Sequence, residues 1–314
     1  MTGFIVRRFG QAIIVIIGVT LLVFWLEQLA PGNIARTILG PRATLAQLKS
    51  FNHQYGLDLS FWRQYLRFLN ELIHGNLGFS WKANRSVDSL VSSELPRDAI
   101  LVGISTVLAV IIAVPLGVQQ AIKRNTAYDY VGTGISFILY SMPPYVPGIL
   151  AIELVAIHWQ IFPTEAPQGS SFGSLLAHPS GLVLPILTLT LVIYALFSRY
   201  MRSSTIDTLA QDYIRTARAK GLSNAEIVRR HVLRNSLIPV ATLVGVSVPQ
   251  ILTAGLITEA LFNFDGIGYQ YFQSAQQNDF PVLAGITVLV GAATVLGNLM
   301  ADIAYGALDP RVRY

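Results

Sequence analysis

The chain has 314 residues, of which 53% are hydrophobic and only 12% charged, with a formal net charge of +5. A typical soluble domain carries roughly 25% charged residues, so a water-soluble globule is excluded and a membrane protein is indicated. The absence of cysteine excludes disulfides, thiolate metal sites and cysteine nucleophiles.

Six segments are long and apolar enough to cross a bilayer, which takes about 20 residues. They are Phe9–Leu29, Ala99–Ala121, Val131–Ile157, Leu182–Arg199, Leu237–Leu261 and Val282–Ala304. Glycine and proline occur inside several of them, and both residues are commoner in membrane helices than in soluble ones. We therefore predict an all-α membrane protein with about six transmembrane helices.

Residues 1–30 are expected to form a short cytoplasmic N-terminus and the first span. Arg7 and Arg8 precede the apolar run, as in a signal peptide, but the run reaches Leu26 without an A-x-A cleavage pattern before Pro31. We expect the segment to be retained.

Residues 31–96 are predicted to form a small helical extracytoplasmic domain between spans one and two. Leu45, Leu48, Phe51 and Tyr55 recur at helical spacing, and residues 61–73 form an amphipathic run. The segment contains several basic residues, but loops longer than about 60 residues are largely exempt from the rule that keeps such residues inside. A loosely structured, solvated loop is the alternative.

Residues 97–314 are predicted to form the membrane core. Residues 158–181 and 262–281 contain no lysine or arginine, whereas eight basic residues lie within 199–234. Short loops rich in lysine and arginine stay cytoplasmic. Both termini and the second and fourth connections are therefore expected on the cytoplasmic side. The basic excess is interpreted as a topology signal, and no nucleic-acid partner is expected.

The cytoplasmic loop at about 200–236 has the most informative pattern. A short helix is predicted to end at Gly221, and Ser223 with Glu226 fits a capping box for the next helix. Tyr213, Ala217 and Gly221 follow at steps of four, giving a small-residue face beside an aromatic ring. Such a helix suits insertion into a partner's cleft, and a basic helix lying on anionic lipid is the equally weighted alternative.

This loop resembles the E-A-A-x-x-x-G loop of ABC importer permeases. Ala217, Gly221 and Leu233 match the pattern of that family, while Arg215, Thr216 and Arg234 depart from it. The form D-Y-I-R-T-A-R-A-K-G-L is similar to the B-type permeases of dipeptide and oligopeptide importers. Further similar stretches occur in order along nearly the whole chain, including Tyr55-Gly-Leu-Asp, Gly75-Asn-Leu-Gly-Phe-Ser and Thr258-Glu-Ala-Leu-Phe-Asn-Phe-Asp-Gly-Ile-Gly.

The resemblance implies a multi-pass subunit of the cell membrane that couples to separate ATPases. The implied ATPase-coupling residues are Tyr213, Ile214, Thr216, Ala217, Lys220, Gly221 and Leu222. The implied partners are a second permease, two ATPase subunits, an extracytoplasmic binding protein and a peptide substrate. The chain contains no G-x-x-x-x-G-K-[ST] phosphate loop, so ATP and Mg²⁺ are expected in the partner subunits and no cofactor in this chain.

Two carboxylates are candidates for the translocation pathway, because ionisable residues inside spans are costly and default to functional hypotheses. Glu153 lies deep in the third predicted span, and Glu259 lies near the end of the fifth. Pairing within the helix bundle, or proximity to the outer surface, is the structural alternative for Glu153. No catalytic residue and no metal site is predicted.

The function that the resemblance implies is an inward-transporting ABC permease subunit working by alternating access, with di- or oligopeptides as the expected cargo. Relatives of the same architecture carry nickel, glutathione or opines, and no residue pattern separates these cargoes. A proton-coupled secondary transporter would need several ionisable groups near the midplane and inverted repeats. A membrane-embedded hydrolase would need a nucleophile or metal cluster at a suitable depth.

Overall fold

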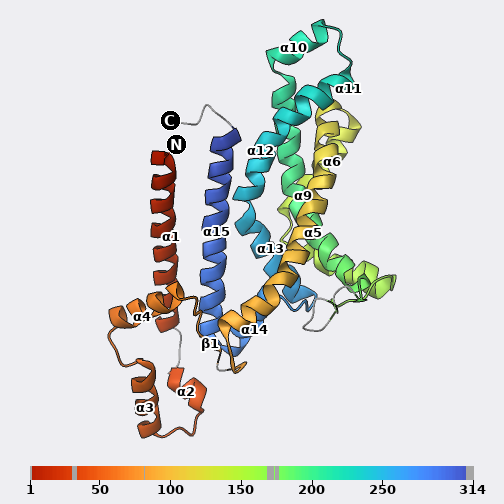
Figure 1. The fold of residues 1–314 in the computed structure, drawn as a ribbon. Coiled ribbons are helices and arrows are strands. Elements are labelled where there is room, and N and C mark those ends of the chain that lie inside the picture. The colour runs from red at the N-terminus through yellow and green to blue at the C-terminus, as the bar shows by residue number, and fades with distance from the viewer. Residues whose placement is uncertain (1, 30–33, 81, 168–172, 174–176, 309–314) are drawn as a thin grey trace.

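The computed structural model describes residues 2–29, 34–80, 82–167, 173 and 177–308. The two arginines that follow the last predicted span, Arg311 and Arg313, support a cytoplasmic C-terminus by their charge but lie outside these residues. Helices make up most of the described chain, as Figure 1 shows, and two two-residue strands accompany them. The predicted all-α membrane fold is confirmed, apart from this small hairpin.

Four helices in the described residues are each long and apolar enough to cross a membrane. They are α1 (Thr2–Leu29), α5 (Val87–Ile122), α9 (Ser180–Leu209) and α15 (Phe280–Leu308). They correspond to the first, second, fourth and sixth predicted spans. The second is longer than predicted, because α5 begins at Val87 after an N-cap in which the Ser86 side chain accepts from the Ser89 amide. The last ten residues of the predicted outer segment 31–96 thus belong to a spanning helix.

The third predicted span is bent rather than straight. It consists of α6 (Ala127–Ser141), then α7 (Tyr145–Ala151) continuing as the π-helical η1 (Ile152–His158), with a bend of 105° between the two parts. Pro143 and Pro144 stand at the break. Two successive residues without an amide hydrogen cannot continue the helical hydrogen bonds. Counted as one span, this pair raises the number of candidate spans in the described residues to five.

The fifth predicted span is also divided. It consists of α12 (Leu233–Val246) and α13 (Val248–Leu261), which meet at Ser247 just before Pro249. Each of these helices has 14 residues, too few to cross a bilayer alone. The short helix α14 (Ile267–Gln277) then leads to α15.

The segment between α1 and α5 is helical, as predicted. It contains α2 (Ile34–Leu39), α3 (Leu45–Tyr55) and α4 (Phe61–Ile73), followed by the antiparallel strands β1 (Phe79–Ser80) and β2 (Arg85–Ser86). A capping box of Thr44 and Gln47 starts α3, and Gly56, with a φ of 69°, ends it. Tyr65 of α4 hydrogen-bonds Thr20 of α1 at 3.0 Å, which ties α4 to the first span.

Figure 1 places α2, α3 and α4 at one end of the molecule. The helices α10 (Asp212–Ala219) and α11 (Asn224–Ile227), followed by the π-helical η2 (Val228–Val232), lie at the opposite end. The N-terminal end of α1 and the C-terminal end of α15 point towards the α10 end. These ends of α1 and α15 thus lie at the same end of the molecule as the basic loop, and the segment between α1 and α5 lies at the other, as the distribution of charge predicts.

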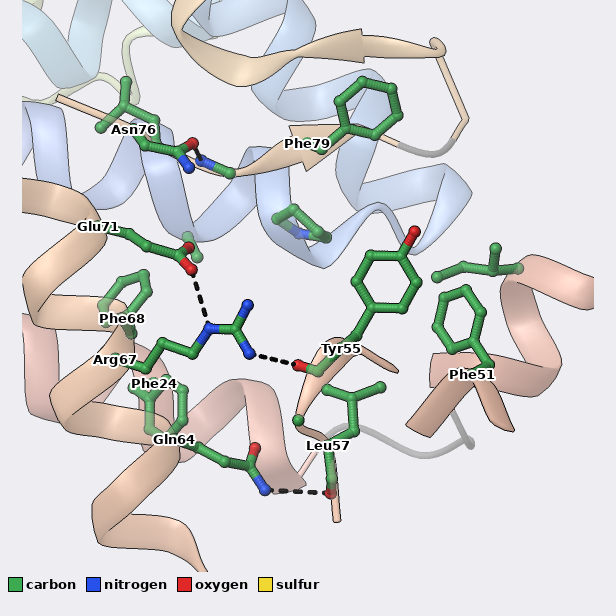
Figure 2. Close-up of a pocket in the computed structure, with 16 residues that line it drawn as sticks. Phe24, Phe51, Tyr55, Leu57, Gln64, Arg67, Phe68, Glu71, Asn76 and Phe79 are labelled. Carbon is green, nitrogen blue, oxygen red and sulfur yellow. Dashed lines mark hydrogen bonds and ion pairs between the residues drawn. The ribbon is translucent and has the colours of Figure 1, made fainter. Parts of the chain in front are cut away.

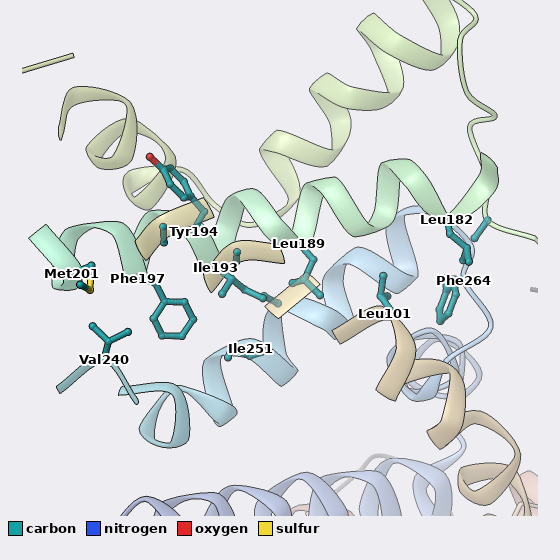
Figure 3. Close-up of a cluster of buried hydrophobic side chains, with 14 of the residues drawn as sticks. Leu101, Leu182, Leu189, Ile193, Tyr194, Phe197, Met201, Val240, Ile251 and Phe264 are labelled. Carbon is teal, nitrogen blue, oxygen red and sulfur yellow. The ribbon is translucent and has the colours of Figure 1, made fainter. Parts of the chain in front are cut away.

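The core is centred on the packing of α5 against α9, shown in Figure 3. Leu101 of α5 is buried with Leu189 and Phe197 of α9 in one apolar cluster. Gly117 brings the two backbones together, since a Cβ there would lie 3.0 Å from the Ser198 carbonyl oxygen. Small residues allow this close helix packing in membranes.

Candidate functional site

The α10–α11 turn has the local structure that its sequence predicts. Helix α10 ends at Ala219, and Gly221 follows with a φ of +83°, a left-handed conformation that favours glycine. The Ser223 side chain accepts from the Glu226 amide at 3.3 Å, and the Glu226 carboxylate accepts from the Ser223 amide at 3.1 Å. The backbone hydrogen bond from Ser223 lowers the pKa of Glu226. The predicted helix break and capping box are both confirmed.

The turn has a small apolar core of its own. Ile214 and Ala217 of α10 pack with Ile227 and Val232 from the following helices. Leu222 is half-buried at the edge of this cluster. Ile214 is fully buried and Ala217 is 7% exposed, so these two predicted coupling residues fix the shape of the turn rather than forming its outer surface.

The other predicted coupling residues lie on the surface. Tyr213, Thr216, Lys220 and Gly221 are all exposed. The predicted continuous face of Tyr213, Ala217 and Gly221 does not form, because Gly221 lies beyond the end of α10 and Ala217 faces the core of the turn. Tyr213 also has a structural contact, since its hydroxyl accepts a hydrogen bond from the Asn235 side chain at 3.1 Å.

Burial explains which positions match the E-A-A-x-x-x-G pattern. The matching Ala217 is buried and the matching Gly221 needs its positive φ. The departing positions Arg215, Thr216 and Arg234 are all exposed. Ala217 and Gly221 therefore match at positions that determine the shape of the turn, Leu233 matches at a half-buried position of α12, and the departing positions lie on the surface.

The helices on either side of the loop, α9 and α12, are joined to each other at its base. The Ser204 hydroxyl of α9 donates to the Ser236 carbonyl of α12 at 3.0 Å, and the Ser236 hydroxyl donates to Thr208 at 3.0 Å. Ser236 is fully buried. A displacement of the turn would therefore act on α9 and α12 together.

Glu259 is buried, with 1% of its surface exposed. Its carboxylate accepts from the Gly268 amide at 2.7 Å and from the Tyr269 amide at 3.4 Å, in the first turn of α14. The Asp98 carboxylate of α5 accepts from the neighbouring Ile267 amide at 3.1 Å. Helix N-termini have free amides and a positive dipole end, both of which favour carboxylates.

Glycine makes this double cap possible. A Cβ at Gly266 would collide with both Asp98 Oδ1 and Glu259 Oε2, so the two carboxylate oxygens converge on one point. A Cβ at Gly268 would come within 2.8 Å of Glu259 Oε2. In this conformation the Glu259 carboxylate therefore faces the backbone of α14.

Sequence reasoning missed the other charged residues around this cap. Arg97 is 4% exposed and donates from Nη1 to the Asp265 carbonyl at 2.8 Å. Its Nε and Nη2, and Glu94 Oε2, are buried without a hydrogen-bond partner. The sequence did contain a signal for a charged cluster, because Glu94, Arg97 and Asp98 lie within one and a half helical turns at the start of a spanning segment.

A second missed feature joins α6 to α9. The Arg202 guanidinium donates to both oxygens of Asp129, at 2.6 and 2.8 Å. Asp129 is 2% exposed and also accepts from the Asn125 amide at 3.0 Å. Two parallel charge-assisted bonds fix relative orientation as well as distance. This pair holds the first half of the bent span against α9.

Glu153 has surroundings unlike those of Glu259. It lies in the π-helical η1 beyond the bend, and its side chain is exposed. The described residues contain no group of three or more histidine, cysteine, aspartate or glutamate side chains placed to hold a metal ion.

The fold is similar to that of one chain of a solved ABC transporter. A solved structure of the MetNI methionine ABC transporter in an inward-facing conformation aligns with a TM-score of 0.57, covering 70% of this chain and 96% of that chain. The sequence identity is 16%, so this likeness shows the fold alone.

The chain belongs to the family of binding-protein-dependent transport system inner membrane components, whose family model matches residues 106–314. The model of the N-terminal region of such membrane components matches residues 1–102. Together the two models span nearly the whole chain, and the resemblance found in the sequence is confirmed.

Several curated relatives match over their full length. The oligopeptide transport system permease AppB of Bacillus subtilis is 34% identical over 100% of both chains. The dipeptide permease DppB of Escherichia coli is 32% identical over 100% of this chain and 99% of its own. The di/tripeptide permease DppB of Pseudomonas aeruginosa is 34% identical over the same shares.

Proposed function

We propose that this chain forms half of the translocation pathway of an ATP-driven importer for di- or oligopeptides. The relatives named for dipeptide, di/tripeptide and oligopeptide transport support this cargo. A second permease subunit completes the pathway, and an extracytoplasmic binding protein delivers the substrate. A cargo of nickel, glutathione or another small solute is the alternative, and the ligand of the associated binding protein distinguishes between these.

The proposed membrane orientation places both termini and residues 200–236 in the cytoplasm. The loop charges support it, as do the ends of α1 and α15, which point to the same end of the molecule as α10. Residues 34–80 would then lie on the extracytoplasmic side, where a binding protein approaches.

The α10–α11 turn is the proposed contact with the ATPase subunit. The observation that carries this proposal is an exposed turn that is braced by its own buried core and lies between two helices, α9 and α12, which hydrogen bonds join to each other. Closure of the two ATPases on ATP would draw the turns of both permeases together, and the attached helices would transmit the motion. ATP and Mg²⁺ bind in the partner subunits, which supply the hydrolysis.

Gly221 offers a sharp test, because a Cβ at this position meets no atom within 4 Å. A side chain there meets no atom of the chain, so within the chain its cost comes from the positive φ, which strains residues other than glycine, and a docked partner would add a collision. We expect Gly221→Glu to keep membrane insertion but to uncouple ATP hydrolysis from peptide uptake. Both activities are measured on the reconstituted complex of permeases and ATPases.

The matched control is Gly221→Asn, since asparagine tolerates the left-handed conformation better than other side chains do. If glycine were needed here only for its backbone conformation, Gly221→Glu would misfold the turn and reduce the amount of the protein in the membrane. Full coupled uptake by Gly221→Glu would exclude the docking role of this turn.

A further inference from the structure

A pocket of about 360 Å³ lies between the helix pair α2–α3 and the rest of the molecule. Figure 2 shows that its walls come from segments far apart in the sequence. Phe51 and Tyr55 of α3 form one wall, and Phe68 of α4 and Phe79 of β1 face them. Phe24 of α1 completes an aromatic lining. The volume falls in the range of small-molecule sites, which is about 300–1,000 Å³.

The polar groups of the pocket are already paired with one another. The Arg67 guanidinium donates to Glu71 at 3.2 Å and to the Tyr55 carbonyl at 3.3 Å. The Gln64 side chain donates to the Leu57 and Leu59 carbonyls. A free peptide, with its ammonium and carboxylate, would compete with these existing bonds, whereas an uncharged ligand leaves them in place. The lining therefore favours an uncharged, apolar ligand.

The floor of the pocket lies at the edge of the membrane-spanning segments. Phe24 is near the end of the apolar stretch Arg7–Leu26, and Pro281 and Ala284 are near the start of Phe280–Met300. The adjacent surface of α1 exposes Leu22, Trp25 and Leu26. Exposed apolar residues on a helix at the edge of the molecule suit contact with lipid tails, which are as apolar as leucine. This side of the pocket therefore lies at the depth where the hydrocarbon region of the bilayer is expected to end.

We propose that this pocket holds an acyl chain of a membrane phospholipid. The acyl chain would extend from the leaflet beside α1 into the pocket and fill the space between α3 and α4. By occupying the gap between the two walls, it would hold the α2–α3 pair at a fixed position against α4 and the β1–β2 hairpin. The site is independent of the transported cargo and of ATPase docking.

Quenching of tryptophan by phospholipids brominated on their acyl chains tests the proposal. The four native tryptophans, Trp25, Trp62, Trp81 and Trp159, are first replaced by phenylalanine. Single reporters are then introduced as Phe51→Trp on α3 and Phe79→Trp on β1, from facing walls of the pocket. Leu45→Trp is the matched control, because Leu45 begins the same helix α3 but is 75% exposed. Each variant is reconstituted with its partner subunits in brominated and in ordinary vesicles.

We expect the Phe51→Trp and Phe79→Trp reporters to lose most of their emission in brominated vesicles, and the Leu45→Trp reporter to keep its emission. Equal emission of all three reporters in both kinds of vesicle would overturn the proposal. Quenching of the control as strongly as the pocket reporters would also overturn it, because α3 as a whole would then lie in the bilayer. A spectral change on adding peptide, without bromine quenching, would assign the pocket to the cargo instead.

Discussion

Glu153 and Glu259 are both single carboxylates within apolar stretches, yet their surroundings are opposite. The Glu259 carboxylate accepts two backbone hydrogen bonds and is shielded from solvent, whereas the Glu153 side chain is exposed beyond a sharp bend. Helical periodicity and composition cannot distinguish the buried Glu259 from the exposed Glu153, because the hydrogen-bond donors to Glu259 lie nine residues further along the chain, beyond the end of its helix. Of the two, only Glu153 has an exposed side chain in this conformation, so it is the one that stays a candidate for contact with a solute.

Glu153→Gln tests that contact. The variant keeps the shape of the side chain and removes its charge, so we expect weaker uptake of peptides that present an ammonium or a basic side chain. Competition between basic and neutral peptides in reconstituted vesicles measures the effect. Unchanged uptake and unchanged selectivity would remove Glu153 from the pathway.

At the scale of elements, α14 is held at its N-terminus by carboxylates from two other helices, Asp98 of α5 and Glu259 of α13. Each satisfies backbone amides that the helix itself leaves unpaired. This arrangement joins the end of α13 to the start of α14, and through them to α5.

The Glu259 cap can be tested by two substitutions of similar size. Glu259→Leu leaves the Gly268 amide buried and unpaired, at a cost of about 1–3 kcal/mol. Glu259→Gln keeps an acceptor oxygen and also removes the repulsion from Asp98, so its cost is expected to be smaller. Thermal unfolding in detergent measures the difference, and equal midpoints for the two variants would contradict the capping role.

The sequence predicted local elements well and their interruptions less well. Gly221 with the Ser223–Glu226 box was readable, because both signals act within a few residues. The bend at Pro143 and Pro144 had a local signal, but single prolines such as Pro115 and Pro185 lie inside unbroken helices. Neither Arg202 as the partner of Asp129 nor the cap on α14 could be read, since each joins residues distant along the chain.

At the scale of the whole molecule, the two ends differ in kind. One end has the short helices and hairpin that cover the ends of α1 and α15, and the other has the single compact turn between α9 and α12. In the described part of the chain the long helices connect these ends, so under the proposed function the orientation of the chain decides which end meets a binding protein and which meets an ATPase.

The absence of native cysteine makes this sidedness directly measurable. Gln54→Cys on α3 and Ala225→Cys on α11 each introduce one thiol at an exposed position. We expect a membrane-impermeant maleimide to label intact cells at position 54 and to label position 225 only after permeabilisation. The reverse pattern would invert the proposed orientation, and labelling of both sites after permeabilisation is the control for reactivity.

The self-contained core of the α10–α11 turn has a consequence for how such subunits change partners. Ile214, Ala217, Ile227 and Val232 lie within nineteen consecutive residues, so the contacts that shape the turn are of low sequence separation and form quickly. The exposed Arg215 and Thr216 take no part in that core. If the turn docks on an ATPase as proposed, substitution at such positions would alter recognition of the partner while leaving the core of the turn intact.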